Sequence, residues 1–127
     1  MEKKIIKSSK APLPVGPYNQ GVIVGNLIYL AGQIPIDAKT NEFVPGGISE
    51  QAEQVIANIK GVLEEAGSSL EKIVKTTVFL KNMNDFPAMN AVYGKYFKPQ
   101  TAPARSTVEV ARLPKDALVE IEVVATI

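Results

Sequence analysis

The sequence predicts an α+β sandwich, in which a mixed β-sheet carries two helices on one of its faces. Two segments, around residues 49–67 and 84–97, repeat apolar residues with the period of a helix. The other apolar segments are short and rich in β-branched residues. They give the order β-β-α-β-α-β-β, with a short additional strand near Lys4. At 127 residues, the chain is expected to form one domain over residues 1–127.

The N-terminal part combines a proline-rich loop with a hairpin. Residues 8–18 contain three prolines and a glycine, so few of their backbone groups can join a sheet, and we expect an ordered loop. Gly25-Asn26 separates the apolar runs 21–24 and 27–31 and suits a tight turn with positive φ. Gly32 should end the second strand, where the missing side chain permits a bend or the close approach of a ligand.

The first helix has a start signal, a regular apolar face and a stop signal. Residues 35–47 are rich in turn formers and should form a surface excursion before it. Ser49 is the predicted N-cap, and Gly67 is the predicted terminator. The apolar positions that follow the helical period are Ala52, Val55, Ile56, Ile59, Val62, Leu63 and Ala66.

The second helix carries a polar residue on its apolar face. It should follow a strand over residues 73–80 and run from a cap at Asn84 or Asp85 to about Phe97. Its spacing places Asn90 on the same face as Phe86, Met89, Tyr93 and Phe97. Two interpretations of Asn90 stay open: a buried structural amide bonded to nearby backbone, or an amide that lines a pocket.

The last two strands place charged side chains on the sheet. Residues 103–110 and 118–123 both alternate with the period of a half-buried strand. Arg105 shares one face of its strand with Thr107, whereas Glu120 points away from the apolar face of the final strand. This pattern suits a solvated face of mixed charges. On the pattern alone this is the ordinary state of an antiparallel sheet, and the alternative is a site where a guanidinium binds a small anion and a glutamate acts as a general base.

Composition excludes several kinds of chemistry. Without histidine or cysteine, the chain has no imidazole base, Ser-His or Cys-His pair, disulfide or thiolate metal site. The glycines form no nucleotide-binding fingerprint and the acids no EF-hand spacing, so we expect neither a metal nor a cofactor. A net charge of +1 argues against nucleic acid as a partner. With no long apolar run and a polar N-terminus, a cytoplasmic protein without a membrane partner is expected.

Two helices can cover only one face of so small a sheet. The other face should carry valine and threonine among its charges, which makes it a candidate for contact with a second copy of the chain. We therefore expect a homo-oligomer.

Several motifs, in order along nearly the whole chain, resemble the RidA (YjgF) family of reactive-intermediate deaminases. They are Ala11-Pro12, Gly16-Pro17-Tyr18, Ala31-Gly32-Gln33-Ile34-Pro35, Met83-Asn84-Asp85-Phe86 and, most specifically, Pro103-Ala104-Arg105-Ser106 with Val119-Glu120-Ile121. The resemblance implies a chorismate-mutase-like fold and a homotrimer, in which three sheets form an inner barrel and clefts between subunits carry the sites. It also implies hydrolysis of 2-imino acids, such as 2-iminopropanoate and 2-iminobutanoate, to 2-keto acids and ammonia without a cofactor.

The resemblance also implies roles for individual residues. Arg105 would bind the substrate carboxylate, and Glu120 would position the attacking water and move its proton. The residues lining the cleft would be Tyr18, Gly32, Asn90 and Thr107. Thr107 stands where many relatives have cysteine, and because the mechanism needs no thiol, we expect hydrolysis to persist. Two alternatives are a trimer that binds small carboxylates without turnover, and an endoribonuclease or translation inhibitor, a label that some relatives carry.

Overall fold

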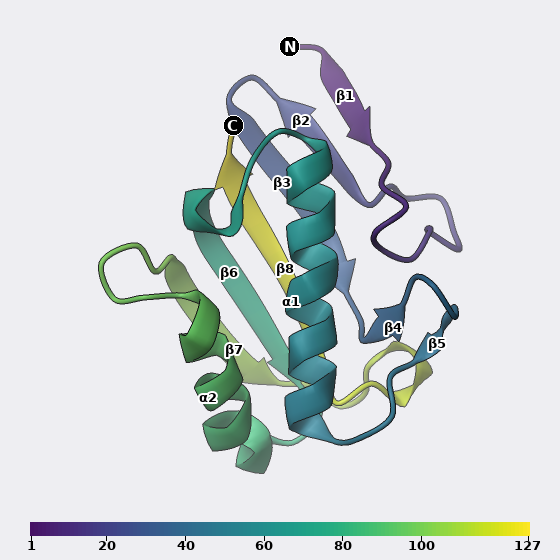
Figure 1. Cartoon of the computed structure of the whole chain (residues 1–127), viewed down its shortest axis with the longest axis vertical. Helices are drawn as coiled ribbons and strands as arrows, with labels where there is room; N and C mark the ends of the chain where they lie inside the picture. Colours follow the sequence, from purple (N-terminus) through teal and green to yellow (C-terminus); the bar gives the residue numbers. More distant parts are fainter.

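The centre of the molecule is a six-stranded β-sheet (Figure 1). A computed structural model describes the chain over residues 1–127. The strands lie in the order β1-β2-β3-β8-β6-β7, so the C-terminal strand β8 is inserted between β3 and β6. Their bounds are β1 (Lys3–Ile6), β2 (Gly21–Val24), β3 (Leu27–Gln33), β6 (Ile73–Leu80), β7 (Ala104–Glu109) and β8 (Val119–Thr126).

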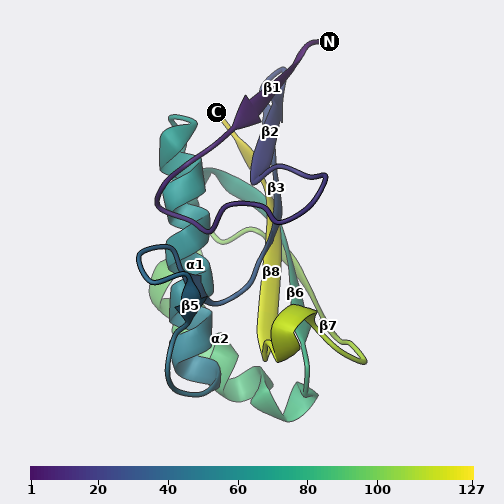
Figure 2. The same ribbon diagram turned by 90° about the vertical axis from the view of Figure 1, so that its right-hand side faces the viewer.

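Both helices, α1 (Ile48–Glu65) and α2 (Phe86–Tyr96), cover the same face of this sheet (Figure 2). Neighbouring strands are antiparallel except for β6 and β7, which are parallel. A parallel pair needs a crossover connection, and α2 lies in that connection. The predicted α+β sandwich, with its mixed sheet and its additional strand near Lys4, is confirmed. Neither helix combines the length and the apolar character needed to cross a membrane.

The start of α1 differs from the prediction. Its N-cap is Gly47, and Ser49 lies inside the first turn. The carboxylate of Glu50 accepts a hydrogen bond from the Gly47 N–H at 2.8 Å, so a side chain within the helix closes the first turn. The predicted terminator is confirmed, because Gly67 has a φ of 78°, a conformation that glycine adopts at little cost.

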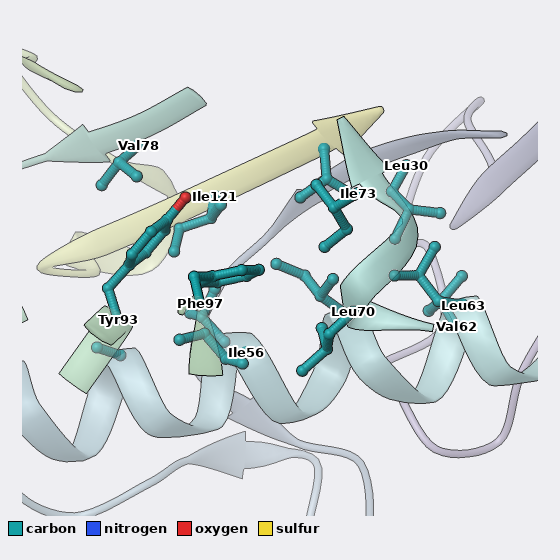
Figure 3. Packing of buried hydrophobic residues seen from close by; sticks show 14 of the residues in the cluster. Leu30, Ile56, Val62, Leu63, Leu70, Ile73, Val78, Tyr93, Phe97 and Ile121 are labelled. Carbon is teal, nitrogen blue, oxygen red and sulfur yellow. The ribbon is translucent and has the colours of Figure 1, made fainter. Parts of the chain in front are cut away.

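The hydrophobic core lies between the helices and the sheet, where 22 buried residues form one cluster. Figure 3 shows part of this cluster. Every apolar position predicted for the first helix either belongs to this cluster or packs against it. Burial of one aliphatic side chain contributes about 1.5–3 kcal/mol relative to exposure, so this face fixes how α1 lies on the sheet.

The opposite face of the sheet is covered by neither α1 nor α2 (Figure 2). Because side chains alternate along a strand, the residues between the buried ones point to this face. Its exposed apolar residues are Ile5, Leu27, Tyr29 and Val108. Lys75, Thr77, Glu120 and Glu122 lie among them, so the bare face mixes apolar and charged groups.

The chain has more regular structure than predicted at the end of β3 and in the surface excursion of residues 35–47. Strand β3 does not end at Gly32 but continues to Gln33, with an irregular register against β8 between Leu30 and Gln33. The bulge accommodates Gly32 inside the strand, so the prediction that this glycine ends it was wrong. The surface excursion contains a small hairpin of β4 (Ile36–Asp37) and β5 (Glu42–Phe43).

The start of α2 lies where the prediction put it. A short 3₁₀ turn, Met83–Asp85, leads into the helix, and Asp85 is its N-cap although its side chain makes no capping hydrogen bond. Instead, the Asn82 side chain accepts a hydrogen bond from the Asn84 N–H at 2.9 Å and stabilises the turn before the helix. Met83 and Asn84 of this turn also line an open cavity.

Candidate functional site

Arg105 lies on β7 and points toward α2. It pairs in register with Thr76 of β6, which is fully buried on the helix-covered side of the sheet. Its Nη1 donates a hydrogen bond to Oδ1 of Asn90 at 2.7 Å. The guanidinium carbon lies 4.6 Å from the ring centroid of Tyr93 and 5.4 Å from that of Phe86. No carboxylate forms a salt bridge with Arg105, so its positive charge is not neutralised within the chain.

An open cavity of about 560 Å³ lies beside Arg105. It is lined by Met83, Asn84, Phe86, Pro87, Arg105 and Thr107. The hydroxyl oxygen of Thr107 is buried and has no hydrogen-bond partner. An unpartnered buried hydroxyl costs about 1–3 kcal/mol, a penalty that an oxygen of a bound ligand would relieve. The cavity therefore offers a cationic donor to a small anion, and an unpartnered hydroxyl is buried in its wall.

The structure excludes one of the two interpretations of Asn90. Asn90 is exposed at the rim of α2, although its neighbour Met89 is fully buried. Its carbonyl oxygen bonds to the Arg105 side chain and not to nearby backbone, so the interpretation as a buried structural amide was wrong. Because β7 is the last strand of the sheet, this part of α2 has no further strand to cover it.

Glu120 lies on the bare face of the sheet. Its neighbours Val119 and Ile121 are buried toward the helices, so the alternation along β8 directs Glu120 the other way. Its carboxylate lies over Gly32 of β3: a Cβ added there would be 2.8 Å from Cδ of Glu120. Burial raises the pKa of Glu120, and the negative charge of Glu122 raises it further. A partly desolvated carboxyl group of this kind is suited to general-base chemistry.

Tyr18 lies three residues before strand β2. It is 50% exposed at the end of the proline-rich loop, so its ring is available to a ligand or to another chain. The loop is organised by Gln20, whose buried side chain bonds to the backbone of Ser8, Ala11 and Pro12. The Gln20 carbonyl accepts a hydrogen bond from the Ala31 N–H at 2.9 Å, which ties the loop to the residue before Gly32.

Five of the six predicted site residues fall into two groups. Arg105, Asn90 and Thr107 lie between β7 and α2, whereas Gly32 on β3 and Glu120 on β8 are in contact. Tyr18 lies in the proline-rich loop, which the Gln20 carbonyl joins to β3. Strand β6 separates β7 from β8, and the two charged groups point to opposite faces of the sheet. Within one chain, therefore, Arg105 and Glu120 do not meet.

The aromatic surroundings of Arg105 were not predicted from the sequence. Phe86 and Tyr93 lie on the apolar face of the second helix, as predicted, but only a core role was expected for them. Their spacing to Asn90 could have indicated that the two rings lie beside the same ligand-facing group, since these three residues lie on consecutive turns of one helix face. The contribution of Met83 and Pro87 to the cavity has no such signal.

Comparison with known proteins places this arrangement in a family. Residues 8–127 match the family model described as Endoribonuclease L-PSP. A RutC family protein of Pyrococcus abyssi is 57% identical over 98% of both chains. The 2-iminobutanoate/2-iminopropanoate deaminase of Escherichia coli is 51% identical over 96% of both chains.

A solved structure gives the same result at the level of the fold. A Rid-family protein of unknown function from Yersinia pestis superposes with a TM-score of 0.96 and 47% identity, covering 99% of this chain and 100% of that chain. Sequence and fold agree over almost the full length. The chain therefore belongs to the RidA (YjgF) family that its motifs predict.

Proposed function

We propose that the protein hydrolyses 2-imino acids, such as 2-iminopropanoate and 2-iminobutanoate, to 2-keto acids and ammonia. The observation that carries this proposal is the partly desolvated Glu120 carboxyl group with its raised pKa, because simple anion binding needs no such base. The unneutralised Arg105 supplies the complementary group for a substrate carboxylate. The name of the Escherichia coli relative supports the same activity.

The proposed chemistry uses only these groups and water. The guanidinium of Arg105 holds the carboxylate of the imino acid, and the carbon of its protonated C=N group is already electrophilic. Glu120 accepts a proton from water as the C–O bond forms. It then returns this proton to the nitrogen, so that the C–N bond breaks and ammonia leaves. As the C=O bond of the keto acid forms, the Glu120 carboxylate accepts the remaining hydroxyl proton and releases it to solvent. General-base assistance of this kind contributes about 10²- to 10⁴-fold to the rate.

We propose that the two halves of the site meet between subunits of a homotrimer. Arg105 and Glu120 point to opposite faces of one sheet, so a single small substrate cannot contact both within one chain. The bare face exposes Tyr29 and Val108 among its charged residues, as expected of a surface that contacts another copy. The trimeric state itself follows the family resemblance, and sedimentation analysis would test it directly.

The other predicted residues would complete the cleft. Gly32 has no partner in the β3–β8 register, which supports its backbone N–H as a donor to the substrate. The unpartnered hydroxyl of Thr107 would bond to the carboxylate beside Arg105. Asn90 and the exposed ring of Tyr18 would line the walls.

The activity can be tested by generating 2-iminobutanoate with a threonine dehydratase and following release of the keto acid. We expect this protein to accelerate release and the variant Arg105→Ala to abolish the acceleration. Arg112→Ala is the matched control, because Arg112 pairs with Asp116 and lies outside the site. No acceleration with several imines, in a protein of verified assembly, would contradict the proposal.

A mixing experiment tests whether the site is shared between subunits. Arg105→Ala and Glu120→Gln chains, each inactive alone, should regain activity when they are unfolded together and refolded as mixed oligomers. If each site takes one group from each of two chains, random mixing restores roughly a quarter of the wild-type sites. Failure of mixed oligomers to regain activity would place both groups in one subunit and overturn the shared site.

A second candidate is a module that binds small carboxylates without turning them over. The separation of Arg105 from Glu120 within one chain favours it, because the cavity beside Arg105 holds an anion-binding group without a base. Binding of a 2-keto acid that depends on Arg105, together with no acceleration of imine hydrolysis, would select this function. Salt-dependent RNA binding at physiological ionic strength would instead favour the activity named in the family model.

A further inference from the structure

Arg105 is held by uncharged groups alone. The rings of Tyr93 and Phe86 face its guanidinium at 4.6 and 5.4 Å, and Asn90 accepts one of its hydrogen bonds at 2.7 Å. The other arginine of the chain, Arg112, donates to Asp116 at 2.8 Å and is thereby neutralised. Arg105 is thus fixed in place without losing its charge.

The ring beneath Arg105 is itself anchored. Tyr93 is buried between α2 and the sheet (Figure 3), and its hydroxyl shares a hydrogen bond of 2.7 Å with the fully buried hydroxyl of Thr76. Phe97 packs beside it with the ring centroids 4.3 Å apart. Burial raises the pKa of the Tyr93 phenol, so this group stays neutral beside the guanidinium. The Tyr93 ring therefore has little freedom to move away from Arg105.

We propose that Phe86, Tyr93 and Asn90 form a neutral cradle that positions Arg105 while leaving its full charge for the carboxylate of the ligand. The inference rests on the proposed function, since it concerns the group that would bind the imino-acid carboxylate. A carboxylate in place of any cradle residue would also hold the guanidinium, but it would compete with the ligand for the same charge. Aromatic faces and an amide oxygen orient the guanidinium without this competition.

The role of the Tyr93 ring is tested by equilibrium binding of 2-oxobutanoate, a keto acid that is not turned over. Tyr93→Leu should weaken binding about tenfold, as expected for loss of a partly desolvated cation–π contact. Tyr93→Phe keeps the ring and should bind within about threefold of the wild type. In the imine assay, Tyr93→Leu should raise KM with little change in kcat, because Glu120 is untouched.

The neutrality of the cradle is tested at Asn90. Asn90→Ala removes the hydrogen bond to Arg105 but adds no charge, whereas Asn90→Asp keeps an acceptor and adds one. The cradle predicts that Asn90→Asp binds 2-oxobutanoate more weakly than Asn90→Ala. If the hydrogen bond alone mattered, Asn90→Asp would bind as well as the wild type, and that result would overturn the inference.

In both tests, loss of binding must be distinguished from loss of folding, and failure of the cradle from failure of the proposed deaminase activity. Since Tyr93 is buried, thermal unfolding and circular dichroism should accompany each variant, and Phe86→Leu replaces Tyr93→Leu if the latter does not fold. Binding by Tyr93→Leu or Phe86→Leu equal to that of the wild type, while Arg105→Ala does not bind, would refute the cradle and leave the deaminase intact. Cradle-dependent binding without any imine hydrolysis would instead refute the deaminase and leave the cradle standing.

Discussion

Gly32 on β3 and Glu120 on β8 are in direct contact, and the carboxylate occupies the space where a side chain at Gly32 would lie. A Cβ at this position would overlap the carboxylate oxygen and approach Cγ to 3.0 Å. The glycine thus accommodates the neighbouring acid, and it makes the position of Glu120 sensitive to a single methyl group.

Gly32→Ala should displace Glu120 without unfolding the protein, because the backbone at Gly32 does not need a positive φ. We expect imine hydrolysis to fall about 10²-fold, the scale of a lost general base, with little change in thermal stability. Gly94→Ala is the control: an added Cβ meets nothing within 4 Å in α2. Since glycine is unfavourable inside a helix, this control should be more stable by about 0.5–1 kcal/mol and fully active. Full activity in Gly32→Ala would contradict the role of Glu120.

Arg105→Ala and Glu120→Gln should separate binding from turnover. Loss of the guanidinium should remove 2-oxobutanoate binding, because no other cation lines the cavity. Glu120→Gln keeps the size of the side chain and should bind 2-oxobutanoate normally while losing turnover. Isothermal titration alongside the imine assay distinguishes the two, and equal loss of binding in both variants would refute this division of roles.

The pH dependence of kcat/KM should reflect the raised pKa of Glu120. A general base works in its deprotonated form, so activity should rise with pH through this pKa, at a higher pH than an ordinary glutamate would give. Because the charge of Glu122 contributes to the shift, Glu122→Gln should move this acidic limb to lower pH. Glu71→Gln, in the short 3₁₀ helix Leu70–Lys72 before β6, should leave the profile unchanged. An identical limb in Glu122→Gln and the wild type would argue that another group is the base.

Gln20→Leu should destabilise the protein by about 3 kcal/mol, because several backbone groups lose their buried partner at once. Its Oε1 accepts from Ser8 N–H at 2.6 Å, and its Nε2 donates to Pro12 O at 2.9 Å. Chemical unfolding measures the change, with the exposed Gln100→Leu as the control. A destabilisation below that of the control would show that the loop is held by other contacts.

The sequence predicted the helices and strands well because their signals are local. The apolar period of α1 and the alternation in β8 each involve one element, and both appear in the structure as expected. The cap at Ser49 was wrong because a second local signal, the side chain of Glu50, closes the helix from Gly47. Competition between two nearby caps cannot be resolved from residue type alone.

The site was harder to predict because its geometry depends on non-local pairing. Alternation gives the face of Arg105 within β7 and that of Glu120 within β8. Whether these faces coincide depends on the parallel pairing of β7 with β6 and the antiparallel pairing of β6 with β8. Likewise, Asn90 lies on the predicted helix face but is exposed, because β7 is the edge strand. Gln20 has no sequence pattern that distinguishes it from a surface glutamine.

The opposed orientation of Arg105 and Glu120 links the proposed activity to the amount of protein present. If one small molecule must contact both groups, a chain in isolation is catalytically silent, and each working centre exists only while chains stay associated. The activity per chain would then fall on dilution. The total activity would rise more than proportionally with the concentration of the protein.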